Sequence, residues 1–225
     1  MLDQSTPEGR IVAAALGLAA ARPWREISLL DIAEAASTDL VDLRRHFGSK
    51  SAILAAFSRA VDDVVLRQAR RPAEGQSPRD ALFEVVMSRL DALAPYKAAV
   101  RSIAADSSLD PAAIGGLLSS QAWMLNAAGI GTDGLEGGVK VAGLAGVYAS
   151  VLRTWLDDDD PGMARTMAAL DRRLRRGERS LEALGEAMGF ARRMVGLVMP
   201  GVTAGARPAG AAADEAGASS TAAPR

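Results

Sequence analysis

Four basic side chains fall within seven positions of one another, and their types suit them to binding phosphate. They are Arg44, Arg45, His46 and Lys50. Lys and Arg side chains that reach nucleic-acid phosphates release condensed counterions, which favours binding at low salt. We therefore expect phosphate contacts from Arg45, His46 and Lys50. His46 is the only histidine of the chain, so it indicates neither a catalytic dyad nor a histidine metal site.

Residues 28–50 must position this cluster, and they have the pattern of two short helices joined by a tight break. Ser28 and Asp31, three residues apart, have the spacing of a capping box at the start of the first helix. The second helix places Leu40, Leu43 and Phe47 inward. The pattern predicts a helix-turn-helix, a motif whose second helix lies in the major groove of DNA.

The break between the two helices and the exposed side of the second complete the predicted DNA-binding surface. Thr38 or Asp39 is the N-cap of the second helix, and Asp39, Leu40, Asp42 and Arg44 lie nearest the base edges. The two carboxylates either accept from cytosine amino groups or mark a motif that no longer binds DNA. The full predicted set is Ser28, Thr38, Asp39, Leu40, Asp42, Arg44, Arg45, His46 and Lys50.

The run from Arg10 to Val61 resembles the N-terminal domain of TetR-type transcriptional regulators. The resemblance rests on Ile32-Ala33, on Arg45-His46-Phe47 and on the Gly48-Ser49-Lys50 that follows. The chain departs from the family at Ser37-Thr38-Asp39, where members usually carry Gly-Val-Ser, and at Arg44, where they usually carry Tyr. The resemblance implies a homodimer that binds a double-stranded DNA operator and senses a hydrophobic small-molecule effector.

The composition and charge of the chain limit how it can bind DNA and where it is located. The 225 residues are 49% hydrophobic and only 4% aromatic, contain no cysteine and carry a net charge of −1. Residues 1–50 hold six Lys and Arg residues against seven Asp and Glu residues, so any attraction to DNA is local. No apolar run reaches the length of a membrane span and no signal peptide is evident, so we expect a cytoplasmic protein.

Helical periodicity and helix-capping residues continue to residue 198, and no segment alternates as a strand would. We predict an all-α fold with a helix-turn-helix domain over 1–58, a larger helical ligand-binding and dimerisation domain over 59–199, and a disordered tail over 200–225. The expected helices are 7–22, 28–36, 39–46, 49–70, 78–94, 95–105, 111–128, 135–157, 161–176 and 180–198.

Large flexible side chains on three helices of the larger domain are suited either to a plain core or to a pocket for a hydrophobic ligand. The candidate pocket residues are Phe83, Met87, Leu90, Leu118, Trp123, Met124 and Tyr148. Small residues interleaved with apolar ones on helix 135–157, together with helix 161–176, predict a two-fold four-helix dimer interface. Its candidate residues are Val139, Ala142, Gly146, Val147, Ser150, Met163, Met167 and Leu170.

Residues 78–198 also resemble the lipid-binding accessory family of ubiquinone biosynthesis, which shares the TetR-like fold. Trp123-Met124, Val147-Tyr148 and the acidic run 157–160 carry this resemblance. It implies an isoprenoid-lipid binder with a relic helix-turn-helix and peripheral membrane contact through the last helix, which alternatively packs on its own domain or on a dimer partner. The membrane-facing candidates are Phe190, Arg192, Arg193, Met194 and Leu197.

Two further patterns are explained by turns between helices. The acidic run 157–160 fits a solvated loop in which Asp160 caps the next helix, rather than a cation site. The stretch 129–134 is rich in glycine but lacks a strand before it and a Lys-Ser or Lys-Thr pair after it, so it predicts a turn and no phosphate loop. No activated nucleophile or acid–base pair is evident. We expect no enzyme activity, no metal and no cofactor.

Overall fold

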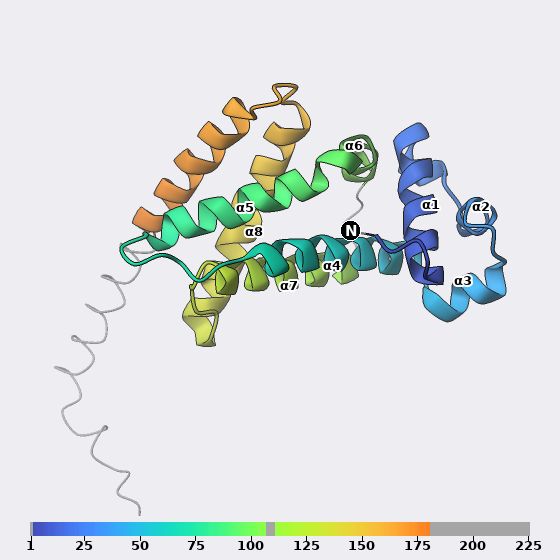
Figure 1. The fold of residues 1–225 in the computed structure, drawn as a ribbon, viewed down its shortest axis with the longest axis horizontal. Coiled ribbons are helices and arrows are strands. Elements are labelled where there is room, and N and C mark those ends of the chain that lie inside the picture. Colours follow the sequence, from blue (N-terminus) through green and yellow to red (C-terminus); the bar gives the residue numbers. More distant parts are fainter. Residues whose placement is uncertain (1, 107–110, 181–225) are drawn as a thin grey trace, which may run out of the picture. The chain divides into compact units, whose positions relative to one another are not determined.

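Helices account for all the regular structure that can be described. The computed structural model describes residues 2–106 and 111–180, and within these ranges there is no strand (Figure 1). The prediction of an all-α fold is confirmed. The elements are α1 (Pro7–Ala21), η1 (Trp24–Glu26), α2 (Leu29–Ala35), α3 (Leu40–His46), α4 (Lys50–Gln68), α5 (Pro78–Leu93), η2 (Ala94–Tyr96), α6 (Lys97–Ala105), α7 (Pro111–Ala127), α8 (Gly134–Leu156) and a further helix over 164–180.

Helices α1 to α3 form a small unit, which we call the head (residues 7–46). Local capping bonds fix where its helices begin: the Ser28 hydroxyl accepts from the backbone N–H of Asp31 at 3.1 Å, and an Asp39 oxygen accepts from that of Asp42 at 2.8 Å. The predicted capping box is therefore confirmed, and Asp39 rather than Thr38 caps α3. Trp24 is also buried, as part of the core of the head.

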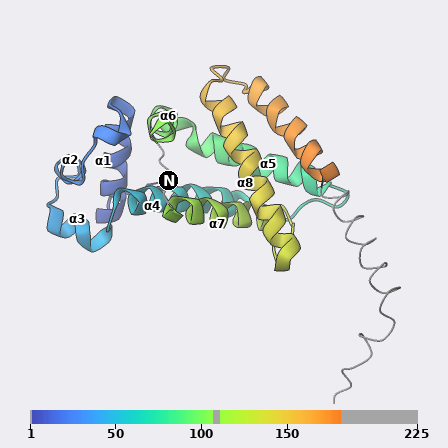
Figure 2. The same ribbon diagram turned by 180° about the vertical axis from the view of Figure 1, so that it is seen from behind.

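Helix α4 leaves the head and runs beside α7, with α5 and α8 completing the larger part of the molecule (Figures 1 and 2). Its apolar stripe, which includes Ile53, Phe57 and Val61, is buried in a core that continues from the head. Residues 2–106 and 111–180 therefore lie in one compact unit. The domain boundary near residue 58 stays a prediction.

A buried polar cluster lies inside this larger part, between α4, α5, α7 and α8. Arg89 forms an ion pair with Asp62 and donates hydrogen bonds of 3.0 Å to Tyr148 Oη and to Ser58 Oγ. The Ser120 hydroxyl donates to Asp62 at 2.8 Å. A buried charge is tolerated when it is paired and hydrogen-bonded, as both charges are here.

Helix α6 connects the head to the far end of α8. Ser102 Oγ accepts from the backbone N–H of Trp24 at 3.0 Å, and Asp106 accepts from that of Arg25 at 2.8 Å. From the same helix, Lys97 Nζ donates to the carbonyl of Asp158 at 2.5 Å, and Arg101 donates to that of Leu156. Cationic donors at the last carbonyls of a helix satisfy its unpaired acceptors and complement its dipole.

The last described helix differs from its prediction. It begins at residue 164 instead of 161, because two carboxylates of the preceding loop cap its first turn. It is described as far as residue 180. Asp158 is buried and accepts from the backbone N–H and the hydroxyl of Thr166 at 2.9 and 2.7 Å, which lowers its pKa. Asp160 accepts from the backbone N–H of Ala164 at 3.1 Å. The acidic loop is therefore only partly solvated.

The glycine-rich stretch after α7 is a turn between helices, as predicted. Gly129 has φ +74° and Gly134 φ +66°, values that favour glycine because a Cβ crowds the backbone there. The predictions for residues 107–110 and for 181–225, including most of helix 180–198, lie outside the described residues.

Candidate functional site

The exposed surface of α3 is the candidate nucleic-acid interface. Because α3 has only seven residues, its orientation depends on the core of the head, where Leu43 and the following Phe47 are buried. The other side of the helix then presents Leu40, Val41 and Arg44 to solvent. Arg44 has no ion pair or hydrogen bond to another described side chain, so its guanidinium is available to a ligand.

The inward placement of Leu40 predicted from the sequence is wrong. Leu40 is 45% exposed and Val41 53% exposed, so two adjacent aliphatic side chains begin the helix on its solvent side. The single-turn pattern was ambiguous because residues 40 and 43 lie on the same side of an ideal helix only approximately, and Leu43 with Phe47 already fills the core. Sequence reasoning did not include Val41 in this surface, although the aliphatic pair Leu40-Val41 between Asp39 and Asp42 is a usable signal.

Two of the three side chains predicted to contact phosphates are paired within the chain. Arg45 forms an ion pair with Asp42 at 2.5 Å, and His46 Nδ1 lies 2.7 Å from a carboxylate oxygen of Glu8. Both pairs are exposed, and exposed pairs are weak enough for a phosphate to compete for the cation. Phosphate contact by Arg45 or His46 therefore uses the nitrogens that these pairs leave over, or competes with a carboxylate.

The third, Lys50, is held more firmly. Its ammonium group donates to the carbonyl oxygens of Trp24 and Ile27 at 2.6 and 2.7 Å. It also lies 4.3 Å from the centroid of the Trp24 ring. The structure therefore turns Lys50 toward the head, and its contact with phosphate stays a prediction.

The remaining predicted DNA-binding residues build the turn and the helix starts. Ser28 donates to Asp31 from its backbone N–H and its hydroxyl, both at 2.7 Å. These bonds, with the Arg22 guanidinium at 3.1 Å, lower the pKa of Asp31 to about 2. Thr38 is half-buried and its N–H donates to the carbonyl of Ala33. Asp39 uses one oxygen as the cap of α3.

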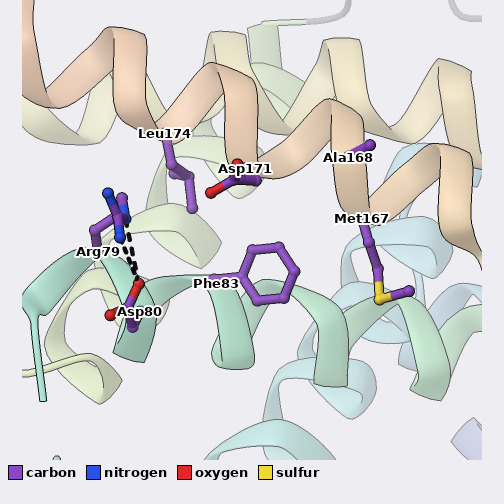
Figure 3. Close-up of a pocket in the computed structure, with 7 residues that line it drawn as sticks. All are labelled: Arg79, Asp80, Phe83, Met167, Ala168, Asp171 and Leu174. Carbon is purple, nitrogen blue, oxygen red and sulfur yellow. Dashed lines mark hydrogen bonds and ion pairs between the residues drawn. The ribbon is translucent and has the colours of Figure 1, made fainter.

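A shallow pocket of about 360 Å³ lies between α5 and the helix over 164–180 (Figure 3). Phe83, Met167 and Leu174 form its apolar surface, and Arg79 and Asp80, 2.9 Å apart, lie at its edge. The volume is within the range of small-molecule sites. Its mixture of an aromatic ring and charged groups suits an amphipathic ligand.

The structure does not bring the predicted pocket residues together around this space. Of the seven, only Phe83 lines it. Leu90, Met124 and Tyr148 are buried in the core, whereas Trp123 is 55% exposed on α7. Met87 and Leu118 are half-buried. The alternative interpretation as core therefore describes Leu90, Met124 and Tyr148.

Four of the eight predicted dimer residues are exposed to solvent, on α8 and on the helix after it. Val139 and Met167 are each 38% exposed, and Ala142 and Gly146 are also exposed. Val147, Ser150 and Met163 are half-buried. Leu170 is fully buried within its own chain because it packs into the core of the larger part, so this residue is not available to a partner.

Helix α8 is unusual for its apolar character. In the part of the chain that the structure describes, it is the one helix long and apolar enough to cross a bilayer, yet only 22% of its most apolar window is buried. The predicted membrane residues Phe190, Arg192, Arg193, Met194 and Leu197 lie outside the described residues. Within 2–106 and 111–180, no three His, Asp or Glu side chains are close enough to hold a metal ion.

Comparison with known proteins places this geometry in a known fold. A TetR transcriptional regulator from Rhodococcus sp. RHA1 is 20% identical with a TM-score of 0.59, over 76% of this chain and 94% of its own. A TetR transcriptional regulator from Nitrosomonas europaea ATCC 19718 is 23% identical with the same TM-score, over 76% of this chain and 97% of its own. The protein therefore has the fold of TetR transcriptional regulators.

A family model agrees with the second resemblance. The model of the COQ9 family matches residues 139–180, which cover most of α8 and the described part of the following helix. No curated protein matches the sequence. The chain is thus similar in fold to DNA-binding regulators over most of its length, and similar in sequence to COQ9 over two helices.

Proposed function

We propose that this protein is a cytoplasmic, non-enzymatic transcriptional regulator that binds double-stranded DNA as a homodimer and responds to a hydrophobic small molecule. The observation that carries the proposal is the helix-turn-helix of the head, with an exposed face on α3 and an unpaired Arg44. The TetR fold supports the same function only by analogy. Function depends on the site that a fold carries, so the surface of α3 carries the proposal.

The larger part supports a dimer through α8. Small residues such as Gly138, Ala142 and Gly146 are exposed on it and allow a second helix to approach closely. Leu135 at 80% exposure and Val139 supply apolar surface that a partner would cover. A two-fold arrangement would set two heads to bind two half-sites of one operator.

The effector is proposed to enter between α5 and the helix over 164–180, at Phe83. The neighbouring Met167 belongs to the predicted dimer surface, so a ligand at Phe83 would touch the helix that also meets the partner. A ligand alters the affinity for DNA only if it binds the two states of the dimer unequally. Contact with Met167 supports this proposal, because a ligand there would touch the helix proposed to meet the partner.

A gel-shift titration with the DNA that flanks the protein's own gene tests the proposal. We expect a specific shift that weakens as salt increases, because any phosphate contact releases counterions. Ala142→Glu should yield a monomer in analytical ultracentrifugation and abolish the gel shift. The control variant Ala98→Glu, on the exposed side of α6, should leave the oligomeric state and the gel shift unchanged. Absence of any duplex binding at low salt would overturn the proposal.

The COQ9 match and the internally paired cations of the head favour one second candidate function, an isoprenoid-lipid accessory protein with a relic helix-turn-helix. In that case mass spectrometry of the purified protein should find a bound isoprenoid lipid. Deletion of residues 180–199 should abolish association with liposomes. A protein that carries no lipid and ignores liposomes contradicts this candidate.

A further inference from the structure

The exposed face of α3 has a chemistry that selects among DNA bases. Leu40, Val41 and Arg44 lie within the first five residues of α3, and Arg44 follows Leu40 by four residues and Val41 by three. Residues at these spacings lie on one side of a helix. The face therefore combines two aliphatic side chains with one unpaired guanidinium.

We infer that α3 recognises the methyl group of a thymine through Leu40 and Val41, and the edge of a neighbouring guanine through Arg44. The inference rests on the proposed DNA-binding function and names the base chemistry of the operator. In the major groove, the thymine C5-methyl is the apolar feature that contacts aliphatic side chains. Guanine offers O6 and N7, to which an arginine donates two parallel hydrogen bonds.

The position of these residues in the motif supports base contact. In a helix-turn-helix, the N-terminal residues of the second helix contact base edges. Leu40 and Val41 are the first two residues of α3, and each is about half exposed. Two adjacent aliphatic side chains left in water at this position gain from burial against an apolar group.

The acids that the sequence places near the bases are partly committed elsewhere. Asp39 Oδ1 accepts from the backbone N–H of Asp42, and Asp42 Oδ1 is paired with Arg45. Each acid has a second oxygen, but turning the carboxylate toward a cytosine amino group would weaken a cap or an ion pair. Leu40, Val41 and Arg44 can contact bases without such a loss, so we assign recognition to them.

The experiment removes the methyl group from the DNA and leaves the protein intact. The full chain is used to select 40-base-pair duplexes from a random library, and the best duplex is resynthesised with each thymine replaced in turn by deoxyuridine. We expect at least one replacement to weaken binding about fourfold, the effect of one buried methyl group. The selected motif should place a guanine next to that thymine.

A protein variant then tests whether Leu40 and Val41 sense the methyl group. The double variant Leu40→Ala/Val41→Ala should bind the thymine and deoxyuridine duplexes equally, whereas Leu30→Ala, a control that is 53% exposed on α2, should keep the fourfold difference. Arg44→Gln should lose the preference for guanine at the adjacent position. Circular dichroism verifies that each variant is folded.

The outcomes separate this inference from the proposed function. A duplex that is bound equally with thymine or deoxyuridine at every position overturns the inference and leaves DNA binding intact. A library from which nothing is enriched at low salt overturns both. Self-association of the protein that Leu40→Ala/Val41→Ala abolishes would identify the face as a protein contact and would also overturn the inference.

Discussion

The ammonium group of Lys50 is bound to the carbonyl of Trp24, 2.6 Å away, and lies over the ring of the same residue. Burial lowers the pKa of Lys50, against the opposing influence of Asp106 and Asp31. A basic side chain that the sequence assigns to phosphate therefore holds α4 to the segment between α1 and α2. This arrangement commits the ammonium group of Lys50 to contacts within its own chain.

The contrast between Lys50 and Arg44 gives the first prediction. Lys50→Ala should lower the free energy of unfolding by about 1–3 kcal/mol, because two carbonyl oxygens lose their donor. Arg44→Ala should leave stability unchanged but weaken binding to the selected duplex by about 1–3 kcal/mol, the value of a bidentate contact to guanine, with little change in its salt dependence. Urea denaturation and anisotropy titrations at several salt concentrations measure both. An unchanged denaturation midpoint for Lys50→Ala would contradict the role of Lys50 in stabilising the head.

The buried ion pair between Asp62 and Arg89 gives the second prediction. Asp62→Leu should destabilise the protein by about 3–5 kcal/mol, because Arg89 remains buried without its counter-charge. The neighbouring Asp63→Ala breaks an exposed pair with Arg67 and should cost less than about 1 kcal/mol. Both are measured by urea denaturation. The double variant Asp62→Leu/Arg89→Met should recover most of the loss, and failure to recover would show that the cost has another origin.

Sequence spacing predicts the helices well where their ends depend on residues three positions apart. Ser28, Asp39 and Ser77 each bond to the backbone N–H of the third residue on, and each begins its helix as expected. The helix over 164–180 begins late because Asp158 bonds to Thr166, eight residues away. Such a contact depends on how the loop folds back, which periodicity does not report.

The conformation of Ser37 gives the third prediction. Its φ of +53° lies in the left-handed region, where a non-glycine residue is strained by contact of its Cβ with the following carbonyl. Ser37→Gly should stabilise the protein by about 0.5 kcal/mol, the relief of strain less the added entropy of the unfolded chain. Ala60→Gly, in the middle of α4, should instead destabilise it by about 1 kcal/mol. Thermal unfolding measures whether each variant gains or loses stability. A loss of stability in Ser37→Gly would contradict the strain inferred at Ser37.

The pKa of Asp31 gives the fourth prediction. Hydrogen bonds from the Ser28 backbone and hydroxyl, then the hydrogen bond and the charge of the Arg22 guanidinium, hold this pKa at about 2, below the ordinary value of 3.8. A carboxyl whose pKa is lowered by folding adds stability above its unfolded pKa, and this stability is lost as pH falls toward its folded pKa. The contribution of Asp31 should therefore disappear between about pH 4 and pH 2.

The test compares urea midpoints of the wild type and Asp31→Asn from pH 6 to pH 2. The variant should be less stable at pH 6, and the difference should shrink as the pH falls. Ser28→Ala, which removes the hydroxyl but keeps the backbone donor, should fall between the two at pH 6. A constant difference across the whole range would contradict the linkage.

The candidate site was predictable in outline but not in its contacts. The cluster of Arg44, Arg45 and His46 predicts an exposed basic surface, and all three residues are exposed at the end of α3. The partner of His46 is Glu8, 38 residues earlier, and no spacing rule connects them. The prediction that Leu40 faces inward failed for a related reason, because the orientation of a two-turn helix depends on the core it packs on.

The bonds from α6 to both the head and the end of α8 bear on how such a protein can be recombined. Ser102 and Asp106 hold the backbone at Trp24 and Arg25, so the head shares part of its hydrogen bonding with a helix that is distant in sequence. A chimera that exchanges only residues 1–50 with a relative leaves those two side chains facing a foreign surface. An exchange that keeps these hydrogen bonds has to move the head together with residues 97–106, and that unit is discontinuous in the sequence.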